Sequence, residues 1–234
     1  MSSEKPEART FLTHWRASAL PASGAWAQKR RLASAMRLVI ERLVRSNAPE
    51  DELRAATERL ERYAERLATH PRLMRYEGFA ETANAGDVGA FFDQSPMIGL
   101  SNPLAPPISL RSTGERRAEG RVNFGSAYEG PPGCVHGGFI AAAFDEVLGF
   151  TQSLTGSPGF TGTLTIVYRK PTPLHTELRF DAEVVGQERR KIFTRARVYA
   201  GDLLTAEAEG IFISADREKF LRLLEARAQR DAEL

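Results

Sequence analysis

Cysteine is almost absent from this chain, since Cys134 is the only one among 234 residues. A single cysteine excludes an intramolecular disulfide framework and a cysteine-based zinc site. The four histidines, at positions 14, 70, 136 and 175, are spread along the chain without the spacing of metal ligands. We therefore expect no metal or redox cofactor.

An excess of charge and a long apolar run are also missing. Lys+Arg 32 against Asp+Glu 30 leaves a net charge of only +2, which argues against nucleic acid as a partner because phosphate binding needs a concentrated basic surface. No stretch approaches the roughly 18 apolar residues of a membrane span. The first 15 residues lack the apolar core of a signal peptide, so a cytoplasmic location is expected.

The N-terminal region is predicted to be helical. Residues 1–25 are polar and predict only a loosely ordered start, whereas residues 26–45 and 50–69 repeat apolar positions at steps of three and four. These two segments predict an antiparallel helical hairpin whose apolar stripes pack against the rest of the protein or a neighbouring subunit. Residues 71–108 are rich in Gly, Pro and Asn and predict long loops with at most a short helix. We place the extension at residues 1–95 and the main domain at residues 96–234.

The main domain has the pattern of an antiparallel sheet with one central helix. Short strands are expected at 108–112 and 119–124, and a charged amphipathic helix at 215–234. Because short connections join the strands, an antiparallel arrangement and an α+β fold are favoured. Four later segments show the β-branched and aromatic residues and the alternation of strands, at 160–170, 177–187, 191–201 and 203–214.

The central helix is the apolar run 134-CVHGGFIAAAFDEVLGF-150. At about 100° per residue, Gly138, Ala142, Asp145 and Gly149 share one face, and the bulky apolar residues lie on the opposite one. Glu146 lies at the flank, where we expect ordinary solvation. A carboxylate on a stripe of small residues either makes a structural hydrogen bond or stands beside a ligand, and the helical wheel alone does not decide between these.

The start of this helix favours the second interpretation. Gly137 and Gly138 follow His136 directly, and the amides of a first helical turn have no intrahelical acceptor. Glycine lets a substrate oxygen approach such amides closely. Amides directed at a carbonyl are what acyl transfer needs to stabilise an oxyanion, so attack on a thioester or ester carbonyl is predicted.

The same residues resemble a known signature. VHGGFIAAAFDEVLG is similar to the motif of hotdog-fold acyl-CoA thioesterases that carry HGG and an Asp nine residues after the His, the phenylacetyl-CoA and mitochondrial long-chain acyl-CoA thioesterase types. The likeness extends over roughly residues 98–214 and includes 126-SAYEGPPGCVHGG-138 and 161-TGTLTIVYRKPTPL-174. It implies a curved antiparallel sheet around the central helix and a homodimer or dimer of dimers. The implied substrate is an acyl-CoA, so coenzyme A enters as part of the substrate and no separate cofactor is expected.

The resemblance also implies roles for individual residues. Gly137 would offer its N–H to the thioester carbonyl, and Asp145, from the partner protomer, would act as general base or nucleophile. His136 would fix the loop and help to polarise the carbonyl, and Thr161 would assist the carboxylate. Thr161 shares a face with Thr163 and Thr165 in the simple alternation of a strand. Substrate contacts are assigned to Gly138, Asn102, Arg169 and Lys170, although Asn102 also suits a turn and the basic pair a solvated strand end.

Three alternatives stay open. Cys134 lies two residues from His136 and would be a competing nucleophile, although no third orienting group is evident. The fold could also bind or sense acyl-CoA without cleaving it. A hotdog hydratase or dehydratase is a weaker option, because no histidine follows Asp145 at helical spacing. The favoured prediction is an acyl-CoA thioesterase that yields the free acid and coenzyme A.

Overall fold

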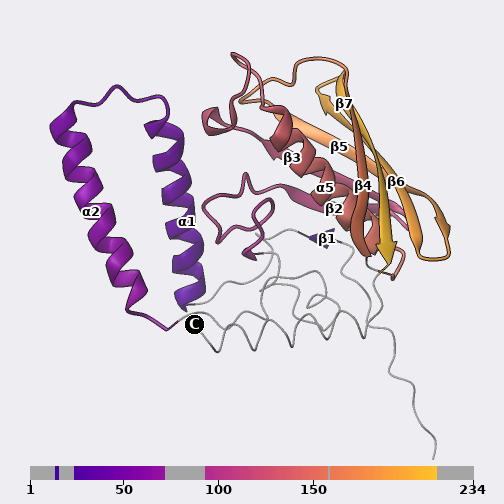
Figure 1. The fold of residues 1–234 in the computed structure, drawn as a ribbon, viewed down its shortest axis with the longest axis horizontal. Helices are drawn as coiled ribbons and strands as arrows, with labels where there is room; N and C mark the ends of the chain where they lie inside the picture. Colours follow the sequence, from indigo (N-terminus) through magenta and orange to yellow (C-terminus); the bar gives the residue numbers. More distant parts are fainter. Residues whose placement is uncertain (1–13, 16–23, 72–92, 158, 215–234) are drawn as a thin grey trace, which may run out of the picture.

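The computed structural model describes residues 14–15, 24–71, 93–157 and 159–214. Two helices come first, α1 (Gly24–Leu43) and α2 (Glu50–Ala68), and they lie side by side in opposite directions (Figure 1). The antiparallel hairpin predicted from periodicity is therefore confirmed. Pro49 precedes α2, and three acidic residues occupy its first turn, where they favour the positive end of the helix.

One sheet of seven strands forms the main domain, and all its pairs are antiparallel. Its spatial order is β1-β2-β3-β5-β6-β7-β4, so β4 forms one edge. The predicted α+β class is confirmed, as are the six predicted strands within a few residues at each end. The strands are β1 (His14–Trp15), β2 (Ser109–Gly114), β3 (Arg117–Asn123), β4 (Gly159–Tyr168), β5 (Glu177–Glu188), β6 (Lys191–Ala200) and β7 (Leu203–Ser214).

The central helix α5 (Gly137–Ser153) lies along one face of this sheet (Figure 1). Its bulky face is fully buried as the helical wheel predicts, and Phe144 meets Phe180 of β5 edge to face with ring centroids 5.2 Å apart. Glycines in the sheet permit this close approach. A Cβ on Gly120 would lie 2.9 Å from Val147, and one on Gly210 would lie 3.2 Å from Leu148.

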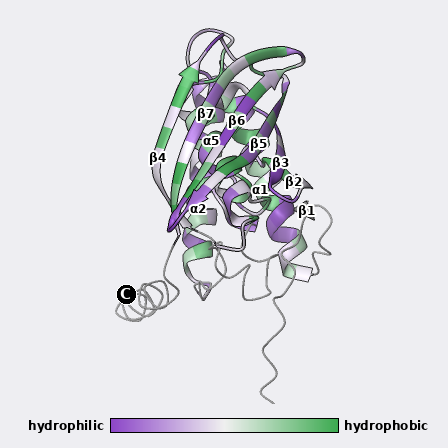
Figure 2. Cartoon of the chain, turned by 90° about the vertical axis from the view of Figure 1, so that its right-hand side faces the viewer, coloured by the Kyte–Doolittle hydropathy of each residue, from purple (hydrophilic) through white to green (hydrophobic). Residues whose placement is uncertain are grey.

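The outer face of the sheet is more polar than the inner one. Hydrophobic and hydrophilic residues alternate along the strands (Figure 2), which is the pattern of an antiparallel sheet with one face on the core and one in water. Along β6 the alternating positions Ile192, Thr194, Ala196 and Val198 are buried against α5. The core is thus a single layer between α5 and the sheet.

The structure corrects one expectation for the N-terminal region and, for another, leaves one of its two alternatives. His14 and Trp15 pair with β2, so the first 25 residues include a strand that the polar sequence does not predict. No residue of α2 is buried, and Leu53, Leu60 and Leu67 are 40%, 54% and 49% exposed. The apolar stripe of α2 therefore does not pack against the described residues of the domain, which leaves the predicted alternative of a neighbouring subunit.

Polar contacts, more than apolar packing, hold α1 to the domain. Ala33 is its one buried residue. Arg30 forms a salt bridge with the fully buried Asp93, with N–O distances of 2.8 to 3.0 Å. Arg37 donates to the carbonyls of residues 100 and 102, and Glu41 accepts from the N–H of Ser126. Arg30, Arg37 and Glu41 lie on one face of α1, because steps of seven and four residues are about two turns and one turn of a helix.

The helix expected at 215–234 and the loop expected at 72–92 lie outside the described residues. Residues 94–108 contain turns and extended segments, in line with the predicted loop. Among the described helices, none is long and apolar enough to cross a membrane.

Replacement of Arg30 by Met tests how α1 is held. Because Asp93 is fully buried, loss of its guanidinium partner strands a charge away from water. We expect the free energy of unfolding to fall by about 3 kcal/mol. The measurement is urea denaturation, with Arg31→Met as the control, because Arg31 is exposed on the same helix. Equal stability of the two variants would show that the salt bridge does not hold α1.

Candidate active site

The first turn of α5 is organised by His136. This residue is the N-cap, with φ −60° and ψ 132°, and its Nδ1 accepts a hydrogen bond from the Gly138 N–H at 3.0 Å. A ring nitrogen that accepts an N–H carries no proton, so the imidazole proton lies on Nε2 in this arrangement. The Gly138 N–H is therefore occupied, and the imidazole retains one N–H donor of its own.

Gly137 keeps an amide without an acceptor. Among the hydrogen bonds of the described residues, none is donated by its N–H, which lies in the first turn where no intrahelical acceptor exists. The carbonyl of the same residue accepts a hydrogen bond of 2.8 Å from the Tyr168 hydroxyl on β4. Tyr168 thereby fixes the orientation of the helix start. It was not among the predicted site residues, although it stands in the YRKP part of the motif.

Asp145 and Thr161 lie together two turns further along α5. The Thr161 hydroxyl donates to Oδ1 of Asp145 at 2.7 Å, and Asp145 is exposed. The predicted pairing of these two residues is present in the structure. It depends on an irregularity of β4, because Thr161 pairs with Phe212 while Thr163 pairs with the adjacent Ile211.

The extra residue of this β-bulge is Gly162. It reverses the alternation, so Thr161 faces α5 while Thr163 and Thr165 face the other way. The expectation that the three threonines share a face is therefore wrong. A Cβ on Gly162 would lie 3.1 Å from a carbon of Ile213 and 3.3 Å from a backbone oxygen, so glycine suits the bulge sterically.

Glu146 is also not the ordinary solvated residue that was expected. It is partly buried, and burial together with the neighbouring charge of Asp145 raises its pKa to about 7, although a hydrogen bond with Ser95 acts in the opposite direction. The Ser95 hydroxyl oxygen in turn accepts from the N–H groups of Met97 and Ile98. A loop some fifty residues earlier in the chain thus covers this carboxyl.

The two halves of the site are separated within one chain. Gly137 and Asp145 are eight residues apart on one straight helix, and a rise of about 1.5 Å per residue places them about 12 Å apart along its axis. Reacting groups must approach within about 3 to 3.5 Å. One protomer therefore does not bring both groups to the same carbonyl.

The other predicted site residues lie away from Asp145 or are engaged elsewhere. The amide of Asn102 donates to the carbonyl of Gln94 and accepts from the N–H of Leu104, as a turn residue does. The Cys134 thiol donates to the carbonyl of Pro132, and no hydrogen bond of the described residues joins it to His136.

Arg169 and Lys170 follow Tyr168 at the end of β4, near the start of α5. The Arg169 guanidinium is paired with Glu207. Lys170 has no ion pair among the described residues, so it is the freer cation of the two. The structure thus brings this basic pair near Gly137 and leaves it far along the strand from Thr161.

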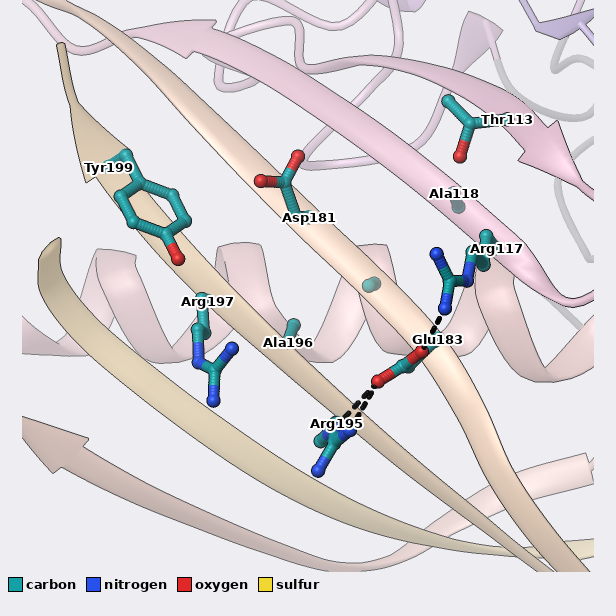
Figure 3. A pocket seen from close by; sticks show the side chains of 10 residues that line it. Thr113, Arg117, Ala118, Asp181, Glu183, Arg195, Ala196, Arg197 and Tyr199 are labelled. Carbon is teal, nitrogen blue, oxygen red and sulfur yellow. Dashed lines mark hydrogen bonds and ion pairs between the residues drawn. The ribbon is translucent and has the colours of Figure 1, made fainter. Parts of the chain in front are cut away.

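A hollow lies on the face of the sheet opposite to α5. It has a volume of about 400 Å³ and lies across β3, β5 and β6, with α5 behind the strands (Figure 3). Its charges are mutually satisfied, since Glu183 binds Arg117 and Arg195, and the hydrogen bond from Arg195 lowers the pKa of Glu183. Such cross-strand pairs are typical of a solvated sheet surface. The described residues also contain no cluster of three or more metal-ligating side chains.

A curved antiparallel sheet around one central helix defines the hotdog class, as the sequence motif predicted. Residues 132–207 match the family model of the thioesterase superfamily. Residues 132–207 are therefore similar to a thioesterase superfamily domain, and the fold around them is of the hotdog class.

Individual relatives agree with this assignment. The chain is 32% identical over 114 residues to acyl-coenzyme A thioesterase THEM4 of Bos taurus, which covers 48% of this chain and 47% of that protein. It is 33% identical over 97 residues to acyl-coenzyme A thioesterase THEM5 of Homo sapiens, with 41% and 39% covered. The chain thus spans less than half the length of these curated relatives.

A solved structure resembles a larger part of the molecule. The crystal structure of a thioesterase superfamily protein superposes with a TM-score of 0.72 at 29% sequence identity, and it covers 83% of this chain and 97% of that one. Because the predicted main domain, residues 96–234, is about three fifths of the chain, a likeness over 83% of the chain includes part of the N-terminal extension. Part of the extension is therefore shared with a second protein.

The raised pKa of Glu146 predicts a pH-dependent stability. The folded chain holds the proton up to about pH 7, whereas the unfolded chain releases it near pH 4.5, so stability falls as the pH rises between these values. From pH 5 to pH 8, Glu146→Gln should gain about 1 to 3 kcal/mol of unfolding free energy relative to the wild type. Urea denaturation across this range measures it. Glu115 lies in an exposed turn, so for the control Glu115→Gln the unfolding free energy should vary with pH as it does in the wild type. The same pH dependence of the unfolding free energy in Glu146→Gln and the wild type would contradict the prediction.

Proposed function

We propose that this protein hydrolyses acyl-CoA thioesters to the free acid and coenzyme A. The observation that carries the proposal is the Gly137 N–H, which has no acceptor among the described residues. The carbonyl of the same residue is held by a hydrogen bond from the Tyr168 hydroxyl. An amide fixed in this way is suited to stabilise the oxyanion of a thioester under attack. The relatives named above, which are acyl-coenzyme A thioesterases, support the same substrate class.

In this mechanism the carbonyl oxygen of the thioester accepts from Gly137, and the Nε2–H of His136 is a second donor near the helix start. Asp145 takes a proton from water, whose oxygen bonds to the carbonyl carbon. When the tetrahedral intermediate collapses, the C–S bond breaks and the proton on Asp145 passes to the departing thiolate. Thr161 orients the carboxylate through its hydrogen bond of 2.7 Å. Direct attack by Asp145 on the carbonyl is the alternative role of the same residue.

The 12 Å separation of the two groups leads to a second part of the proposal, a homodimer with shared active sites. The edge strand β4 offers a surface for it, because it runs for ten residues and Phe160, Val167 and Tyr168 are 49%, 41% and 53% exposed. A long exposed edge strand is a natural site for pairing with another chain.

The contacts of β4 also give a register for the pairing. Thr161 contacts Asp145, and Tyr168 contacts Gly137. An antiparallel pair in which Thr161 lies opposite Tyr168 of the partner subunit brings Asp145 toward Gly137 of the partner subunit. Two complete sites form in this way, one from each pairing.

Replacement of Asp145 by Asn tests the activity itself. The amide side chain keeps the size and the bond to Thr161 but does not accept a proton, so kcat should fall at least about a hundredfold. The measurement is release of free thiol from a panel of acyl-CoAs. Asp202→Asn, in an exposed turn between β6 and β7, is the matched control and should keep full activity. Equal rates for Asp145→Asn and the wild type would remove Asp145 from the mechanism, and tight binding without turnover by the wild type would favour a non-catalytic acyl-CoA binder.

Subunit mixing tests the shared site. Gly137→Pro removes the N–H, and proline is well tolerated at the first position of a helix after an extended residue such as His136. Gly137→Ala keeps the N–H and is the control. Gly137→Pro and Asp145→Asn should each be nearly inactive, yet their mixture after co-refolding should recover up to about a quarter of wild-type activity. Half of the dimers are then mixed, and each of these holds one intact site. A mixture as inactive as its components would contradict a shared site.

A further inference from the structure

Between α1 and the main domain lies an apolar pocket of about 260 Å³. One wall is Ile40 of α1, and the proline-rich segment before β2 contributes Pro103, Leu104 and Pro106. The inner wall is aromatic, from Tyr128 and from Phe139 in the first turn of α5. The helical extension therefore completes a cavity that the main domain alone would leave open.

The charged groups at this pocket are already engaged. The Arg37 guanidinium donates to the carbonyl of Asn102 at 2.8 Å and to that of Leu100 at 3.2 Å. The Glu41 carboxylate accepts from the N–H of Ser126 at 2.7 Å. These side chains hold α1 in place and leave an apolar surface for a ligand. A pocket of this kind favours a hydrocarbon group over a charged one.

The pocket adjoins the start of α5. Phe139 follows Gly137 by two residues, and Tyr128 packs on it edge to face with ring centroids 4.8 Å apart. The carbonyl of Tyr128 also accepts the His136 N–H at 2.8 Å. The residues that form the aromatic wall are thus the ones that hold the helix start in position. A hydrocarbon group attached to a carbonyl at the Gly137 N–H has this pocket beside it.

We propose that this α1-covered pocket receives the acyl group of the substrate and limits its size. The proposal rests on the thioesterase activity proposed above and assigns its substrate class. A dry cavity of about 150 Å³ holds benzene, so about 260 Å³ holds an acyl group of roughly ten non-hydrogen atoms. Medium-chain straight acyl groups and arylacetyl groups have this size, whereas long-chain fatty acyl groups exceed it. The extension is then a specificity-determining part of the enzyme.

Replacement of Ile40 by Trp tests the pocket by filling it. Octanoyl-CoA, phenylacetyl-CoA, palmitoyl-CoA and acetyl-CoA are assayed by thiol release with the full-length protein. The wild type should prefer octanoyl-CoA or phenylacetyl-CoA, and Ile40→Trp should lower kcat/KM for these two at least tenfold relative to acetyl-CoA. The matched control is Val39→Trp, because Val39 is 50% exposed on α1 and lies outside the pocket. This control should keep the octanoyl-to-acetyl ratio within twofold of the wild type.

Each outcome decides one of the two proposals. An unchanged ratio in Ile40→Trp, an equal change in both Trp variants, or a wild-type preference for palmitoyl-CoA would overturn the acyl pocket while leaving the thioesterase activity in place. A wild type that cleaves no acyl-CoA would instead overturn the activity. In that case calorimetry with the non-hydrolysable thioether octyl-CoA tests whether the pocket binds an acyl group. Octyl-CoA should bind at least tenfold more tightly than coenzyme A to the wild type and to Val39→Trp, and this gain should be lost in Ile40→Trp. Retention of this affinity gain in Ile40→Trp would overturn the proposal that the pocket receives the acyl group.

Discussion

The burial of the bulky face of α5 against the sheet is the contact on which the other features depend. Phe144, Val147 and Leu148 are completely buried, and the close fit is possible because two strands carry glycine where the helix crosses them. A helix held so tightly on one side has a fixed rotation about its axis. Its small-residue face, with Asp145, is then turned toward the edge strand β4. The same packing fixes the position of the first turn and with it the orientation of the Gly137 amide.

Much of this arrangement is predictable from the sequence because it is periodic or local. The helical wheel separates the buried face of α5 from the face that carries Asp145, and the strand segments follow from β-branched residues and turn signals. The glycine pair after His136 indicates an accessible helix start for the same reason. These inferences need only the geometry of one element, which a run of ten to twenty residues contains.

The features that could not be predicted depend on elements far apart in the sequence. A wheel places Glu146 at the flank of α5 but does not reveal that Ser95 lies over it. The alternation of β4 misplaces Thr161 because register is set by the neighbouring strand, here β7, and not by the residues of β4 themselves. The attachment of α1 likewise depends on salt bridges and backbone carbonyls more than sixty residues away. A hydrophobic stripe alone does not indicate which surface it meets, and the stripe of α2 is buried by none of the described residues.

Because of the bulge at Gly162, the number of residues in β4 determines which side chains face α5, whatever those residues are. Thr161 and Tyr168 must both face α5, yet they are seven positions apart, an odd number that a regular strand would place on opposite faces. The unpaired glycine supplies the missing step. Deletion or insertion of one residue in this stretch would therefore turn one of the two side chains away, however conservative the remaining sequence. Changes of two residues would keep the faces but move the contacts apart by about 7 Å. β4 can thus vary in composition far more freely than in length.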